Sequence, residues 1–157
     1  MKEDIYAKAA DILDQLREIE LAIADLYRRF ASAFSADRTF WQDLAREEDH
    51  HAALAEELKR SLLKNGSPFE VAKLNPAAVA AFRHSIDLQL ARLERGEVGR
   101  REALFVARDF ERGLIERRLY ESVRSEKRDY RASQEKIRRQ TEEHYQKLQN
   151  YILTVFR

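Results

Sequence analysis

The sequence contains no cysteine, only four glycines and two prolines, and no long apolar run. Without cysteine, the chain forms no disulfide and offers no thiolate to a metal, an iron–sulfur cluster or a substrate. Any metal must therefore be held by nitrogen and oxygen atoms. No window approaches the roughly 18 apolar residues of a membrane span, and the N-terminus lacks the apolar core of a signal peptide. We therefore expect no membrane partner and a cytoplasmic protein.

An excess of charge of one sign is also missing. The 29 lysines and arginines nearly balance the 28 aspartates and glutamates, leaving a net charge of +1. Such a chain has no strong positive field to hold a phosphate backbone, so we expect no nucleic-acid partner. The 157 residues, 36% of them charged and 44% hydrophobic, suit one domain over residues 1–157. With so little glycine and proline, this composition favours an all-α fold.

Apolar residues recur at helical spacing in the first part of the chain and predict a helix over about residues 4–33. The stripe consists of Leu13, Leu16, Ile23, Tyr27, Phe30 and Phe34. Glu20 occupies the position that is missing from this stripe, between Leu16 and Ile23. The helix that buries the leucines must therefore point one carboxylate inward.

A second helix follows a turn and helix N-cap predicted at Ser35–Asp37. Its inward positions are Phe40, Leu44, Glu48, His51, Ala55, Leu58 and Leu62. Asn65-Gly66-Ser67-Pro68 predicts its end. This stripe contains an acid and an imidazole three residues apart, which lie on the same face of a helix.

The remainder predicts three more helices. One opens at Asn75-Pro76 and runs to Gly96, another starts at Gly99, and the last passes through His144, with a turn expected near Lys127. The predicted architecture is therefore two αα-hairpins joined by a long connection that carries its own helix.

An antiparallel hairpin brings residues to the same height when they are equally far from its turn. In the first hairpin, Glu20 and the Glu48/His51 pair are placed in this way about a turn near residue 35. In the second, the same holds for Glu111 and the Thr141/His144 pair about a turn near residue 127. The sequence therefore predicts that four helices bring acids and imidazoles to one level of the bundle.

A weak internal repeat supports this arrangement. Tyr27 and Tyr120 are 93 residues apart, and so are His51 and His144. Glu20 and Glu111 are 91 apart, so the register slips slightly between the two halves. The offset superposes the first hairpin on the second.

Several carboxylates buried together repel one another and lose their hydration, which costs several kcal/mol for each unpaired charge. No lysine or arginine lies on the predicted inward faces at this level, so we expect a metal cation. Carboxylate and imidazole ligands suit iron, manganese or zinc. The predicted metal ligands are Glu20, Glu48, His51, Glu111 and His144.

Alternatives remain at two of these positions. Glu47 competes with Glu48, although it is expected beside the site rather than in it, and Glu116 competes with Glu111. Tyr27 is expected in the core, with its hydroxyl near a ligand carboxylate. Taken alone, an acid–histidine pair is more often part of a solvated helix face; the agreement among four helices favours the metal site.

At these residues the chain resembles the ferritin-like superfamily and, within it, the rubrerythrin-like group. Its Glu20, Glu48-x-x-His51, Glu111 and Thr141-x-x-His144 follow that family's order along nearly the whole chain. The resemblance implies a four-helix bundle, a homodimer, and a carboxylate-bridged di-iron site. It also implies peroxide reduction, ferrous oxidation or iron handling.

The chain departs from this family pattern in two ways. Thr141 stands where the pattern has a glutamate, and Glu142 and Glu143 point about 100° and 200° away around the helix. We therefore expect two iron ions of unequal affinity, one tight and one weak, with Thr141 beside the site. Because there is no cysteine for an iron–sulfur domain, electrons would come from an external donor protein. The alternative is a degenerate bundle that serves as a non-catalytic metal- or partner-binding scaffold, and the sequence assigns no catalytic residue.

Overall fold

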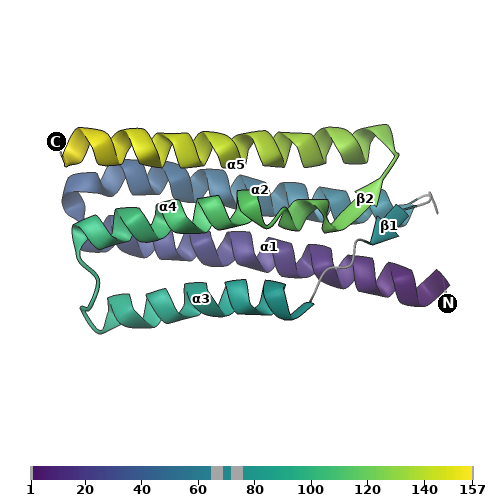
Figure 1. Cartoon of the computed structure of the whole chain (residues 1–157), viewed down its shortest axis with the longest axis horizontal. Coiled ribbons are helices and arrows are strands. Elements are labelled where there is room, and N and C mark those ends of the chain that lie inside the picture. Colours follow the sequence, from purple (N-terminus) through teal and green to yellow (C-terminus); the bar gives the residue numbers. More distant parts are fainter. Residues whose placement is uncertain (1, 65–68, 72–75, 157) are drawn as a thin grey trace.

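The computed structural model describes residues 2–64, 69–71 and 76–156, and this part of the chain is almost entirely helical. Four long helices run side by side: α1 (Lys2–Ala33), α2 (Arg38–Lys64), α4 (Arg100–Glu116) and α5 (Arg128–Val155) (Figure 1). A fifth helix, α3 (Pro76–Glu94), packs against α1 (Figure 1). The all-α prediction is confirmed.

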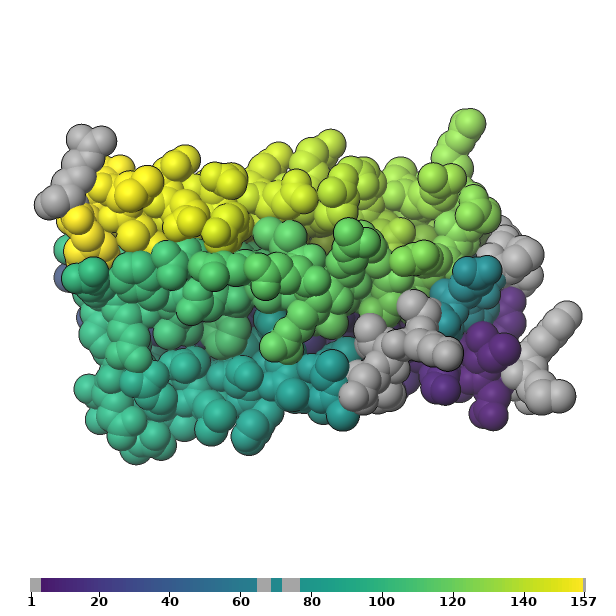
Figure 2. All heavy atoms as spheres, in the orientation of Figure 1, coloured from purple at the N-terminus to yellow at the C-terminus, as the bar shows by residue number. Residues whose placement is uncertain are grey.

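The contacts between elements follow the predicted hairpins. Helix α1 packs along α2, α4 packs along α5, and the two pairs meet where α2 contacts α5. Figure 2 shows that side chains of α3, α4 and α5 cover most of one face, so that α1 and α2 appear mainly at its edges. Among the described residues, no helix combines the length and the apolar character needed to cross a membrane.

The predicted apolar stripes form the core. The stripe of α1 is buried except for Phe34, which is partly exposed. In α2, Trp41 is fully buried whereas its neighbour Phe40 is only partly buried, so the inward stripe begins one residue later than predicted. The predicted stop at 65–68 and the cap at Asn75 lie outside the described residues. Helix α3 begins at Pro76, as expected for a proline in a first turn.

The connection between α4 and α5 differs from the expected simple turn near Lys127. Helix α4 ends at Glu116, and a 3₁₀ turn (Leu119–Ser122) and strand β2 (Val123–Ser125) follow before α5 begins. Strand β2 pairs antiparallel with β1 (Phe69–Val71), placing Phe69 opposite Ser125 (Figure 1). This short ladder was not predicted, because three residues are too few for a reliable alternating pattern. It ties the long connection to the second hairpin.

Asp37 lies at the predicted turn between α1 and α2, within a 3₁₀ turn (Ser35–Asp37), but its carboxylate binds across the bundle. Arg100 donates two hydrogen bonds to it, at 2.7 and 2.8 Å, and the Tyr151 hydroxyl donates a third at 2.5 Å. The side chain of Asp37 is buried. One carboxylate thus connects the first hairpin to the start of α4 and to the last turns of α5.

Replacing Asp37 with asparagine is expected to lower the free energy of unfolding at about pH 7 by about 2 kcal/mol, because the Arg100 guanidinium loses its charged acceptor. The hydrogen bond from Arg100 holds the pKa of Asp37 below its ordinary value. Its contribution is therefore complete above the usual aspartate range and is lost as the pH falls through the lowered native pKa. Urea unfolding of both proteins should give a difference that shrinks in acid. Asp87→Asn, which removes an exposed ion pair with Arg83, is the control; an equal loss there would contradict the assignment.

Candidate metal centre

The five residues predicted as metal ligands come together inside the bundle. Helix α1 contributes Glu20, α2 contributes Glu48 and His51, α4 contributes Glu111 and α5 contributes His144. Each is at most 2% exposed. The equal-height argument for the two hairpins therefore placed these residues correctly, whereas their role as ligands stays a prediction.

The two imidazoles direct one ring nitrogen, Nδ1, at the carboxylates. His144 Nδ1 lies 2.8 Å from Glu48 Oε1 and 3.8 Å from Glu111 Oε1. His51 Nδ1 lies 3.4 Å from Glu48 Oε2 and 3.8 Å from Glu20 Oε2. The two rings stack with their centroids 4.7 Å apart. Glu48 therefore lies between the histidines, with one oxygen beside each.

The other ring nitrogen, Nε2, of each histidine is held from outside the cluster. His51 Nε2 lies 3.0 Å from the side-chain oxygen of Gln140, and His144 Nε2 lies 2.5 Å from a carboxylate oxygen of Glu47. Lys147 in turn donates to the other Glu47 oxygen at 2.8 Å. Because these acceptors favour a proton on Nε2, they leave the Nδ1 lone pairs facing inward. Metal-binding histidines are commonly oriented in this way.

Glu47 therefore lies beside the site, as expected, and Gln140 was missed. The signal was present in the sequence, because Glu47 and Gln140 have the same 93-residue separation as the two histidines. The repeat thus extends to the groups that orient the imidazoles.

Two buried tyrosines orient the outer carboxylates, each across the hairpin boundary. Tyr27 on α1 donates to Glu111 Oε1 at 2.9 Å, and Tyr120, which follows α4, donates to Glu20 Oε1 at 2.8 Å. Tyr27 therefore lies against a carboxylate of the cluster, whereas its role beside a metal stays a prediction. Tyr120 had no assigned role, although its 93-residue separation from Tyr27 marked it as the equivalent residue.

One oxygen of each central carboxylate has no hydrogen bond within the described part of the chain. These atoms are Oε2 of Glu20, Glu48 and Glu111, and all are buried. The basic groups that lie against these carboxylates are the two imidazoles. Buried acceptors without partners are rare and costly, and a cation bound among them would satisfy all three together.

The pKa values show how the cluster would neutralise itself without a cation. Burial and the nearby Glu20 carboxylate raise the pKa of Glu48 to about 8. Burial also raises the pKa of Glu20, but the contacts with the neighbouring Glu48 and His51 side chains outweigh it and hold that pKa at about 2. Burial lowers the pKa of His51, yet its contacts with Glu20 and Glu48 raise it to about 11. Without a metal, Glu48 and His51 would therefore hold protons that a bound metal would displace.

A metal ion fits at least one position in this cluster. Glu48, His51 and His144 each offer a donor atom, and the three atoms lie within 4.8 Å of one another. The carboxylates of Glu20 and Glu111 flank this group on either side. One carboxylate and two imidazoles suit iron, manganese and zinc, so the donor chemistry agrees with the unpartnered oxygens.

In the described part of the chain, neither Glu116 nor Thr141 donates a hydrogen bond to the carboxylates of the cluster. Glu116 is exposed, so Glu111 is the acid of α4 that enters the cluster. Thr141 is buried on α5, but its hydroxyl donates to the Ile137 backbone oxygen at 2.8 Å. It therefore offers no hydrogen bond to the carboxylates.

Comparison with known proteins adds no family to this description. No protein-family model, curated protein or solved structure matches the chain.

Proposed function

We propose that this chain binds metal through Glu48, His51 and His144, with Glu20 and Glu111 as additional ligands. The observation that carries the proposal is the set of three buried carboxylate oxygens without hydrogen bonds, placed around two inward-facing Nδ1 atoms. A divalent cation would satisfy these acceptors together and would offset the repulsion among the acids. The outer partners of the imidazoles further support a ligand role.

We further propose a ferritin-like, rubrerythrin-like protein that holds iron in one tight and one weak position. The support is the order of ligands along the chain and the two hairpins separated by a connecting helix. In this proposal the activity is peroxide or oxygen reduction, or iron handling, with electrons from an external donor protein. A homodimer belongs to the same proposal, and manganese and zinc remain alternative metals.

The residues and the metal would divide the chemistry. A redox-active metal would supply electron transfer to peroxide or oxygen. The chain would fix its coordination, because Gln140 and Glu47 orient the imidazoles while Tyr27 and Tyr120 orient the carboxylates. The burial of the candidate ligands would exclude bulk water and strengthen these electrostatic contacts.

Thr141 motivates a second candidate function, a scaffold that has kept the bundle without redox turnover. The residue stands at the place of a carboxylate and directs its hydroxyl to its own helix. In that case the protons on Glu48 and His51 would stabilise the cluster permanently. Elemental analysis identifies a metal-free scaffold, because that protein would be folded and contain no bound metal. A scaffold that binds metal without turnover would contain metal but give no ferric band.

Anaerobic titration of the metal-free protein with Fe(II) tests the proposal. We expect saturable binding, followed by a ferric absorption band after addition of peroxide or oxygen. Glu48→Ala should abolish both, because it removes the carboxylate that lies between the two histidines. Glu57→Ala, which changes an exposed acid on the same helix, should change neither.

The outcomes distinguish the parts of the proposal. Binding without a ferric band would retain the metal site and remove the oxidase activity. No binding by the folded parent protein would favour the scaffold. Equal binding by both alanine variants would place the metal elsewhere, and circular dichroism would confirm that the Glu48 variant is folded.

A further inference from the structure

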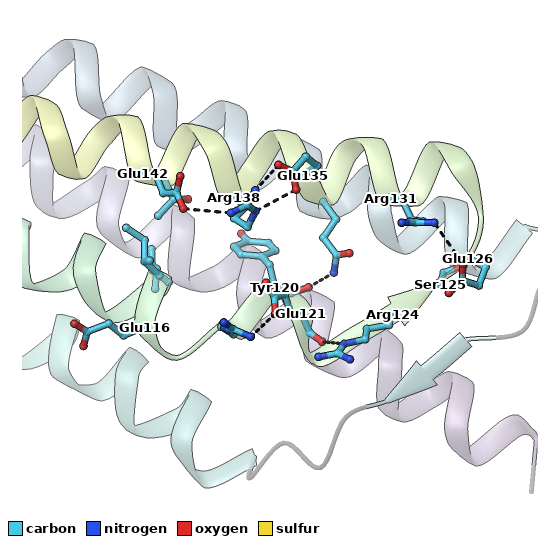
Figure 3. A pocket seen from close by; sticks show the side chains of 15 residues that line it. Glu116, Tyr120, Glu121, Arg124, Ser125, Glu126, Arg131, Glu135, Arg138 and Glu142 are labelled. Atoms are coloured by element: carbon cyan, nitrogen blue, oxygen red, sulfur yellow. Dashed lines mark hydrogen bonds and ion pairs between the residues drawn. The ribbon is translucent and has the colours of Figure 1, made fainter.

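A groove between α4 and α5 reaches the same level of the bundle as the metal centre. Its volume is about 580 Å³. Figure 3 shows Glu135, Arg138 and Glu142 of α5 along one side, with Glu116 and Glu121 along the other. The groove is large enough for a small organic molecule.

Thr141 and Tyr120 line the groove, and Tyr120 also contacts the cluster through Glu20. Thr141 is 3% exposed and lies three residues before His144, so the two share a face of α5. Tyr120 is 7% exposed, and its hydroxyl donates to Glu20. The inner end of the groove therefore reaches one residue that bonds a candidate ligand and one that precedes a candidate ligand by one helical turn.

The repeat identifies what is missing at this point. Glu48 precedes His51 by three residues, and Thr141 precedes His144 by three, with 93 residues between the two pairs. A threonine is shorter than a glutamate and here turns its hydroxyl to the Ile137 backbone oxygen. The second half of the site consequently lacks one carboxylate on the side that faces the groove.

Charge supports filling this position with an anion. Two divalent ions would bring four positive charges into a buried site where Glu20, Glu48 and Glu111 supply three negative ones. An unbalanced charge in a dry interior is costly. One additional carboxylate would restore the balance and supply the missing oxygen donor.

The lining of the groove allows an organic acid to enter. Arg138 pairs with Glu135 and Glu142, and Arg131 pairs with Glu126, so that charges of both signs occur together along it. Leu114 and Ile115 supply apolar surface. The lining of the groove is therefore not uniformly negative, so it does not repel a carboxylate. Its apolar side chains can contact the hydrocarbon part of an organic acid.

We infer that this groove admits a small organic carboxylate, which binds in the gap left by Thr141 and supplies the carboxylate that the second hairpin lacks. The inference rests on the proposed metal function and names the class of ligand that the site takes. A carboxylic acid substrate and a permanent small-acid ligand share this chemistry. Two-electron oxidation of the bound acid, with peroxide reduced to water, would identify a substrate, and recovery of the acid unchanged would identify a ligand.

The test uses the full chain loaded with Co(II), whose visible absorption reports a change of ligands. Titration with acetate and then butyrate should produce a saturable spectral change. In Thr141→Glu the built-in carboxylate should occupy the gap and weaken acetate binding by about tenfold or more. Thr141→Val keeps the space and should retain acetate binding, and Glu126→Gln, at an exposed position of the groove, should also retain it.

Each result has a defined meaning. Failure to bind Co(II) would overturn the proposed function itself. Normal Co(II) binding with no response to acetate, or an equal response in Thr141→Glu, would overturn only this inference. If glutamate at position 141 prevents folding, Thr141→Met fills the same space without charge and should cause the same loss of acetate binding.

Discussion

Replacing Glu111 with glutamine is expected to raise the free energy of unfolding of the metal-free protein by about 1–3 kcal/mol at about pH 8. Glutamine keeps an oxygen that can accept the hydrogen bond from Tyr27, but it carries no charge. Burial and the nearby Glu48 carboxylate raise the pKa of Glu111 well above its ordinary value. Keeping this group ionised in the folded state therefore opposes folding.

The sign of the pH dependence follows from this raised pKa. The folded parent binds a proton at Glu111 that the unfolded chain has released, so its stability falls as the pH rises from the ordinary glutamate range towards the native pKa. The variant lacks this proton, and its advantage should grow with pH. Urea unfolding in the presence of a chelator, at about pH 5 and about pH 8, measures the difference.

Metal should reduce the variant's advantage, and should reverse the order of stability where that advantage is smaller than the difference in gain. At a free metal concentration about a hundredfold above the Kd, the parent gains about 2.7 kcal/mol, whereas the Glu111→Gln variant lacks one ligand and gains less. Glu116→Gln, an exposed change on the same helix, should follow the parent throughout. A variant less stable than the parent in chelator at both pH values would show that the buried acid carries no electrostatic cost.

Replacing Thr141 with glutamate is expected to raise tightly bound metal from about one ion per chain towards two. The new side chain would stand to His144 as Glu48 stands to His51. The other candidate ligands of the second position, Glu111 and His144, are already in place. Metal analysis after exhaustive dialysis would measure the change.

The matched control is Thr154→Glu, which adds an acid at an exposed position of the same helix and should leave the metal content unchanged. Equal metal content in the parent and Thr141→Glu would show that the missing carboxylate does not limit the second position. Two tightly bound ions in the parent would show that another group already replaces it.

The convergence of the acids could be predicted because hairpin geometry makes height a function of distance from the turn. To predict that Glu20 and Glu48 lie at the same height, it was enough to place the turn approximately near residue 35. The same argument placed Glu111 correctly although the connection before α5 is not a simple turn, because the inward face of α4 tolerates an error of several residues in its end. Burial then separated Glu111 from Glu116.

Contacts between residues far apart in the sequence could not be predicted in this way. Asp37 looked like a turn residue and helix cap, and nothing local indicates that Arg100 and Tyr151 reach it. The β1–β2 ladder depends on two three-residue segments that acquire strand structure by pairing with each other. Gln140 became recognisable only once the site showed that the repeat includes groups outside the ligand set.

Each tyrosine hydroxyl bonds a carboxylate of the other hairpin, so neither hairpin alone contains both an acid of the centre and the tyrosine that orients it. Tyr27 of the first hairpin donates to Glu111 of the second, and Tyr120 of the second donates to Glu20 of the first. A slip of one hairpin past the other by a single helical turn, about 5.4 Å, would break both bonds at once. Both hydrogen bonds therefore form only when the two hairpins pack in the correct register. The state of the centre reports whether the bundle has assembled correctly.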